Sequence, residues 1–268
     1  MLFSAVFFSL DSWQLGLVIF AIVGGACVVG VVIGRYLRRH SEHYREGIGA
    51  LQGALLGLVG LILAFGLTLA VNRYQDRRAD VVNEANTIGT AYLRAQTLAE
   101  PQRSRSLTLL RRYNDLAIRL TRDKPVSASF RATTAEQDRL QQTLWQLGGE
   151  AINAQPRNSS PRLYIDSLNA MIDQQGVRIA GLNNHPPNAV LVLELFGAAL
   201  ALGMLALYIS VLGRGLLPVA LAAVVVTFLV LVTFDLDRPT RGLITVPASP
   251  LLAEKATMSL PPAAPAPR

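Results

Sequence analysis

Four stretches of the chain, each about 20 residues long or longer, lack charged side chains almost completely. They cover residues 13–34, 48–71, 188–212 and 216–234, the third of which contains a single acid, Glu194. A helix of about 20 apolar residues, rising 1.5 Å per residue, crosses the roughly 30 Å hydrocarbon layer of a bilayer. The sequence therefore predicts four transmembrane helices, and the mean hydropathy of +0.36 agrees with this.

The alternation of apolar and charged stretches predicts the organisation of the chain. A short connection after Arg35 and the turn Gly213-Arg214-Gly215 indicate two hairpins of spans. We expect an all-α fold, in which four transmembrane helices form two hairpin pairs around a helical extramembrane domain. The predicted segments are a lead-in (1–12), the first pair (13–71), the helical domain (72–187), the second pair (188–235), a juxtamembrane segment (236–247) and a Pro/Ala-rich tail (248–268) that we expect to be disordered.

The middle segment reads as helical, because it shows no sustained period-two alternation. Residues 80–98 continue the helical pattern of the second span, so that helix is expected to run on unbroken. Pro101 and Pro161 are expected near helix starts, since proline is tolerated in a first turn. Thr133 and Glu136 have the spacing of a capping box, which predicts another helix start there.

Charge and motifs exclude several classes of protein. The net charge is +7, and residues 73–187 hold 16 basic and 11 acidic side chains, scattered rather than in a stripe. This favours anionic lipid headgroups or small anions over nucleic acid. The single cysteine, Cys27, excludes an internal disulfide. With no catalytic or phosphate-binding motif, and with His40, His43 and His185 in loops, we expect no enzyme activity, no catalytic residues, no metal site and no cofactor.

Small residues form a stripe along the second span. Gly49, Gly53 and Gly57 follow at four-residue spacing, and Gly30 and Gly34 do the same in the first span. Such stripes let helix backbones approach closely in lipid. Two interpretations stay open for the second span: packing inside one subunit, or a seam between subunits or a pore-facing surface.

Polar residues suggest two further features. Glu194 lies in a span, where an acid is costly, and it either snorkels to the nearby interface or has a function. A candidate polar network outside the apolar cores is interpreted either as a buried network that holds the helical domain to the spans or as a ring of charges at a pore mouth. Its members are Glu84, Asn86, Thr87, Arg94, Asn169, Asp173, Arg178, Asp235, Asp237 and Arg238.

An ordered set of segments resembles the bestrophin-like domain family of uncharacterised bacterial membrane proteins. The segments are GALLGL (53–58), AF (64–65), EANTIGTAYLR (84–94), RY (112–113), LW (144–145), LNAMID (168–173) with Arg178, and LDRP (236–239) with Gly242. The resemblance covers roughly residues 15–250 and implies a multi-pass protein of the bacterial inner membrane. Bestrophins themselves are pentameric anion channels with an apolar neck on the second span, which by analogy implies a neck at Leu61, Phe65 and Leu69. The sequence lacks the acidic calcium clasp of animal bestrophins.

Two functions stay open at this stage. One is a homo-oligomeric channel for small anions. The other is a non-transporting scaffold or sensor whose helical domain binds a partner. The side of the membrane is also open: the arginines of the short loop near Arg35 favour a cytoplasmic loop, whereas the bestrophin resemblance implies a cytoplasmic helical domain.

Overall fold

The computed structural model describes residues 10–38, 45–125, 127–238, 240 and 242–263. In these residues the chain consists of helices and their connections, without a strand. The chain divides into two compact units. Unit 1 comprises Met1–Tyr74 and His185–Thr245, and unit 2 comprises Gln75–Asn184 and Val246–Arg268. The predictions for most of the lead-in, for the loop histidines His40 and His43 and for Pro239 lie outside the described residues.

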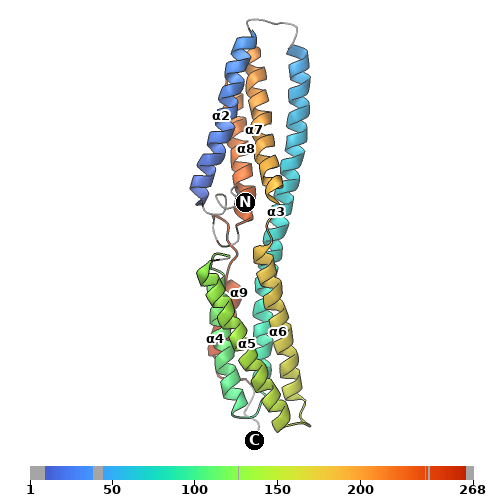
Figure 1. Ribbon diagram of the computed structural model, residues 1–268, viewed down its shortest axis with the longest axis vertical. Coiled ribbons are helices and arrows are strands. Elements are labelled where there is room, and N and C mark those ends of the chain that lie inside the picture. Colours follow the sequence, from blue (N-terminus) through green and yellow to red (C-terminus); the bar gives the residue numbers. More distant parts are fainter. Residues whose placement is uncertain (1–9, 39–44, 126, 239, 241, 264–268) are drawn as a thin grey trace. The chain divides into compact units, whose positions relative to one another are not determined.

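Unit 1 contains α2 (Ser12–Arg38), the first part of α3 (Arg45–Ala95), α7 (Asn188–Val211) and α8 (Leu217–Leu236). Within the described residues, four helices are long and apolar enough to span a membrane, and these stretches match the predicted spans. Helices α2, α7 and α8 lie side by side in Figure 1 and pack against one another. Their buried apolar side chains, such as Ile19, Leu202 and Val230, form the core of this unit.

The closest helix packing in unit 1 joins α2 to α7. A Cβ added at Gly30 would lie 3.0 Å from the carbonyl carbon of Gly203, and one at Gly34 would lie 2.7 Å from the Cβ of Ser210. Glycine is required here because the partner atoms belong largely to backbone. Helix α2 therefore packs closely on α7, a pairing that the sequence did not predict. The small residues of α2 allow this approach, and the α7–α8 hairpin is present as expected.

The small-residue stripe on α3 has a different environment. A Cβ at Gly49 would lie 3.0 Å from the ring of Tyr208, but a Cβ at Gly53 or Gly57 would meet nothing within 4 Å. Packing inside the chain thus explains Gly49 alone. Gly53 and Gly57 have open space beside them among the described residues, and both interpretations of the stripe stay open there. Helix α3 lies against α7 through longer side chains, such as Val59 against Gly197.

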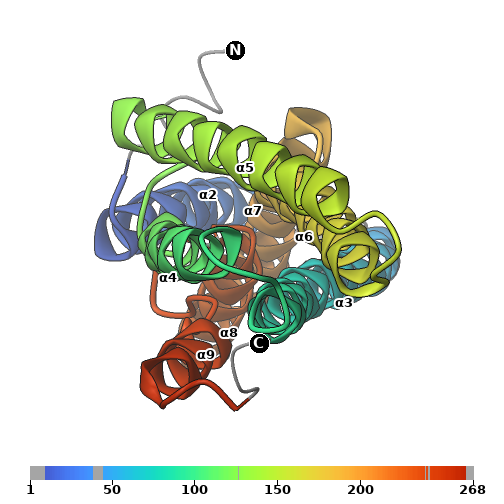
Figure 2. The same cartoon turned by 90° about the horizontal axis from the view of Figure 1, so that it is seen from below.

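Unit 2 contains the rest of α3 with α4 (Gln102–Leu120), α5 (Ala128–Ala154), α6 (Ser160–Asn183) and α9 (Ser249–Ser259). In Figure 2, α5 lies beside α4 and α6, and these neighbours pack against it. The continuous α3 and the helix starts after Pro101 and at Ser160-Pro161 agree with the sequence.

The start of α5 differs from the prediction. Ser127 caps the helix by accepting a hydrogen bond from the Phe130 backbone N–H at 3.1 Å. Thr133, expected to be the cap, lies inside the helix and donates to Asp123 Oδ2 at 2.7 Å. The helix therefore begins six residues before Thr133, with Ser127 as its cap.

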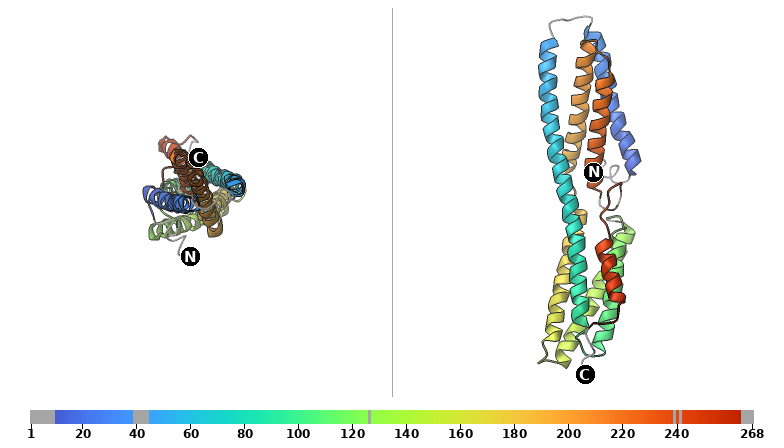
Figure 3. Two further views of the ribbon diagram at one scale, coloured as in Figure 1. Left: turned by 90° about the horizontal axis from the view of Figure 1, so that it is seen from above. Right: turned by 180° about the vertical axis from the view of Figure 1, so that it is seen from behind.

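The tail also differs from the prediction, because residues 249–259 form α9 rather than a disordered segment. Helix α9 packs on α4, as the rear view in Figure 3 shows. Its Leu251 and Met258 are buried. The Tyr92 hydroxyl donates to the Met258 carbonyl at 3.0 Å, and the Asn114 side-chain amide donates to the Leu251 carbonyl at 3.1 Å. Leu251 and Met258 are seven residues apart and therefore lie on the same face of the helix. These two buried apolar side chains hold the short segment on unit 2 despite its composition.

We expect Tyr92→Phe to weaken the attachment of α9. The substitution removes the hydrogen bond to the Met258 carbonyl and the acceptor for Arg111 Nη2, which lies 2.7 Å from the hydroxyl. A lost hydrogen bond of this kind costs about 0.5–1.5 kcal/mol. Faster amide hydrogen exchange in α9 would report the loss. The control is Thr257→Ala, since that hydroxyl donates to the Ala253 carbonyl of α9 itself. Equal exchange in both variants would contradict the prediction.

Candidate functional site

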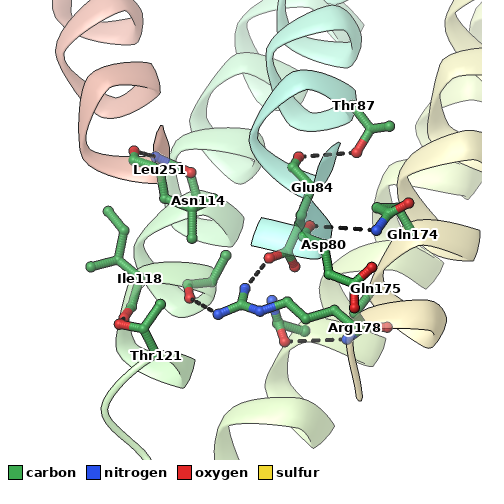
Figure 4. A network of polar contacts seen from close by, with 12 residues as sticks. Asp80, Glu84, Thr87, Asn114, Ile118, Thr121, Gln174, Gln175, Arg178 and Leu251 are labelled. Atoms are coloured by element: carbon green, nitrogen blue, oxygen red, sulfur yellow. Dashed lines mark hydrogen bonds and ion pairs between the residues drawn. The ribbon is translucent and has the colours of Figure 1, made fainter. Parts of the chain in front are cut away.

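The predicted polar residues form separate groups, each inside one unit, rather than one network. The central group of unit 2 is an ion pair between Glu84 of α3 and Arg178 of α6, and both side chains are buried. Arg178 also donates through Nη2 to the Ala117 carbonyl of α4 at 3.1 Å. Figure 4 shows the Arg178 guanidinium where its own helix, α6, meets α3 and α4. One side chain thus ties three helices of unit 2 together.

Burial shapes the electrostatics around this pair. Desolvation lowers the pKa of Arg178 to about 10, against the attraction of Asp80. The pKa of Asp80 is raised, chiefly by its own burial and by the neighbouring Asp76. The arginine therefore keeps its charge at neutral pH. Asp80 also bonds to Gln174 through its backbone: Gln174 Nε2 donates to the Asp80 carbonyl at 3.4 Å (Figure 4).

A chain of buried amides, which the sequence analysis missed, lies in the same unit. Gln141 Nε2 donates to the Tyr113 hydroxyl at 3.0 Å and to Gln175 Oε1 at 2.8 Å, and Gln175 Nε2 donates to Gln137 Oε1 at 3.2 Å. Burial raises the pKa of Tyr113, so the phenol stays protonated. The available signal was the four-residue spacing of Gln137 and Gln141, which puts both on the helix face that buries Leu144.

The other predicted residues of unit 2 make local contacts. The Thr87 hydroxyl donates to the Glu84 carbonyl of its own helix at 3.0 Å. Arg94 donates to the Leu163 carbonyl and forms an exposed ion pair with Asp166. Asn86 is exposed, and Asn169 donates to Asp173 at the surface of α6 at 3.2 Å. These residues do not join the Glu84–Arg178 pair.

The juxtamembrane acids organise the end of α8 in unit 1. One carboxylate oxygen of Asp235 accepts from the backbone N–H groups of Leu243 and Ile244 at 2.7 and 2.9 Å, and the other accepts from the Ser12 hydroxyl at 2.6 Å. Gly242, at φ 125°, packs directly against this carboxylate, so a side chain there would collide with it. Arg238, also predicted, is buried and donates to the Leu10 carbonyl.

Asp237 forms a second group in unit 1. It is buried and accepts two hydrogen bonds from Arg73 of α3, from Nε at 2.7 Å and from Nη2 at 3.0 Å. This two-pronged geometry is the strong form of an arginine–carboxylate pair. The acid was predicted from the sequence but its partner was not, because the two are far apart in the chain.

Glu194 does not snorkel. Its side chain is only 3% exposed, and its carboxylate lies against Gly66 of α3, where a Cβ would collide with it. Gly66 was not predicted. A single sequence does not show that this glycine of one span faces the acid of another span.

The candidate neck residues share one exposed face of α3. Leu61, Phe65 and Leu69 are 54, 62 and 53% exposed. The opposite face of the same helix is buried, with Val59, Leu63 and Ala70 against the rest of unit 1. In the described residues, no group of three or more His, Cys, Asp or Glu side chains converges as metal ligands would.

Taken together, the helices define an all-helical protein with four candidate membrane spans. Residues 20–251 match the model of the bestrophin-like domain, and the chain therefore belongs to the bestrophin-like family. No sequence similar enough to count as a relative was found among curated proteins.

Two solved structures are similar in fold. One is a bacterial bestrophin homologue from Klebsiella pneumoniae, with a TM-score of 0.60 and 15% identity over 87% of this chain and 94% of that one. A variant of that homologue with one tryptophan replaced by alanine gives a TM-score of 0.61 at 15% identity, over 88% and 93% of the two chains. At this identity the likeness establishes the fold.

Proposed function

We propose that this protein is an oligomeric anion channel of the bacterial inner membrane, in which Leu61, Phe65 and Leu69 form the neck. The observation that carries the proposal is the exposed apolar face of α3. Its residues repeat every four positions, so they line one side of the helix, and more than half of each side chain is left exposed by the described residues. In a ring of subunits these faces would enclose a narrow apolar constriction, of a kind that gates by dewetting.

The glycines beside this face support an assembly of subunits. Gly53 and Gly57 have free space next to them in a single chain, and small residues are what close contact between membrane helices requires. Four spans in one chain leave no room for a wide pore, so conduction needs a homo-oligomer. The excess of basic residues in segment 73–187 favours anions over cations.

The test is chloride efflux from liposomes that contain the purified protein. Phe65→Ala is expected to raise the efflux rate several-fold, because it widens the constriction, and Phe65→Trp is expected to lower it. The same pair at Leu61 and Leu69 maps the length of the neck. Phe228→Ala and Phe228→Trp serve as the matched control, since Phe228 is 63% exposed but lies on α8.

Each outcome bears on the proposal. Efflux that responds at Phe65 and not at Phe228 supports a neck on α3. Folded, oligomeric protein that gives no efflux above empty liposomes overturns the channel and favours the membrane scaffold or sensor. A protein that is strictly monomeric in mild detergent overturns it as well.

A further inference from the structure

Glu194 is a buried acid inside the membrane unit. It lies six residues into α7, or about 9 Å along the helix. In the part of the chain that the structure describes, its Oε2 is buried and has no hydrogen-bond partner. Neighbouring positions on α7 and α3, such as Leu191, Leu195 and Leu63, belong to the apolar core. An ionised carboxylate in such a place is costly, because nothing replaces the water it has lost.

The charged groups around Glu194 are already committed. Arg73 of α3 and Asp237 at the end of α8 are the two that act on it electrostatically, and they are paired with each other. Asp235 of α8 is bonded to backbone N–H groups. Helix α2, which also packs on α7, carries its basic residues Arg35 and Arg38 in its last turn, by the far end of α7. In the part of unit 1 that the structure describes, the cation that acts on the Glu194 carboxylate is therefore already paired with Asp237.

Glu194 and Asp237 contact the same side of α3. Glu194 lies against Gly66, and Asp237 is bonded to Arg73. Gly66 and Arg73 are seven residues apart, which is two helix turns, so the two acids face one stripe of that helix. The guanidinium of Arg73 is the group for which the two acids would compete if both were ionised.

We propose that Glu194 is a proton-binding site of the membrane unit, and that its occupancy decides whether Arg73 is held by Asp237 alone. With the proton bound, Glu194 is neutral and fits against Gly66, and Arg73 stays with Asp237. When the proton leaves to water, the carboxylate gains a negative charge and draws Arg73 towards α7. The pairing of α3 with the end of α8 then weakens.

Infrared difference spectroscopy of the full chain in lipid nanodiscs tests this without any transport measurement, so its outcome is independent of the channel proposal. Exposed carboxylates are already ionised in near-neutral buffer. The wild type is therefore expected to show the carbonyl stretch of a protonated carboxylic acid in near-neutral buffer, and to lose it in alkaline buffer. Glu194→Gln should lack this pH-dependent band. Glu100→Gln, at an exposed glutamate of unit 2, should keep it. Labelling wild-type glutamates with carbon-13 should shift the band, which identifies a glutamate even if a variant folds poorly.

A second variant tests the competition for Arg73. Asp237→Asn leaves the guanidinium to Glu194, so the band should disappear at a more acidic pH than in the wild type. A band that is unchanged in Glu194→Gln, or absent from the wild type between near-neutral and alkaline pH, overturns the proton site. The latter is also the result expected if a metal cation rather than a proton neutralised the carboxylate. An unchanged midpoint in Asp237→Asn overturns the competition.

Discussion

Replacing Arg178 with methionine is expected to lower the free energy of unfolding of unit 2 by about 3–5 kcal/mol. The reason is not the attraction lost in the ion pair but the charge that remains. Glu84 is fully buried, its Oε1 already lacks a hydrogen-bond partner among the described residues, and without Arg178 the whole carboxylate would be uncompensated. The Ala117 carbonyl would lose its donor as well.

The measurement is urea unfolding of the full chain in detergent, followed by the fluorescence of Trp145 in unit 2. Trp13, the other tryptophan, lies in unit 1 and is replaced by phenylalanine in every variant. The matched control is Asp166→Asn, which breaks the exposed Arg94–Asp166 pair and should cost no more than about 1 kcal/mol.

The double variant Glu84→Gln with Arg178→Met separates the two explanations. If the cost comes from the orphaned charge, removing both charges should recover a large part of the stability, and the two effects should not add. Equal losses for Arg178→Met and Asp166→Asn would contradict a buried role for the pair.

The sequence was sufficient for the architecture of the spans, because uncharged length is a local property. It predicted the four apolar helices, the continuous α3 and the absence of strands in the middle segment. It failed where a distant partner decides. Residues 249–259 look like a disordered tail until Tyr92 and Asn114 supply donors for their carbonyls. Thr133 looks like a helix cap until Asp123 binds its hydroxyl.

The candidate site shows the same limit. Glu84, Arg178, Asp235 and Asp237 were all predicted as polar residues of interest, but only the fold shows which group each of them contacts. Arg73 and Gly66 were missed because each matters through a residue more than a hundred positions away. The pairing of α2 with α7 was missed for the same reason, although Gly30 and Gly34 had been identified as a packing stripe.

Gly30→Ala is expected to destabilise unit 1 by about 1–3 kcal/mol, the usual cost of overpacking a tight contact. A Cβ at this position would lie 3.0 Å from the Gly203 carbonyl carbon and 3.1 Å from the Leu207 nitrogen. Both atoms belong to the backbone of α7, so no side chain can rotate away and the two helices must separate. The gain in helix propensity, about 1 kcal/mol for glycine to alanine, offsets only part of this cost.

The measurement is denaturation of the full chain in mixed micelles with a rising fraction of SDS. Gly25→Ala is the matched control on the same helix, because a Cβ there meets nothing within 4 Å. Propensity alone then acts, and the control should be neutral or slightly stabilising. The two substitutions are chemically identical, so opposite signs would isolate the contact between α2 and α7. A Gly30→Ala variant as stable as Gly25→Ala would show that α2 does not approach α7 at this distance in the membrane.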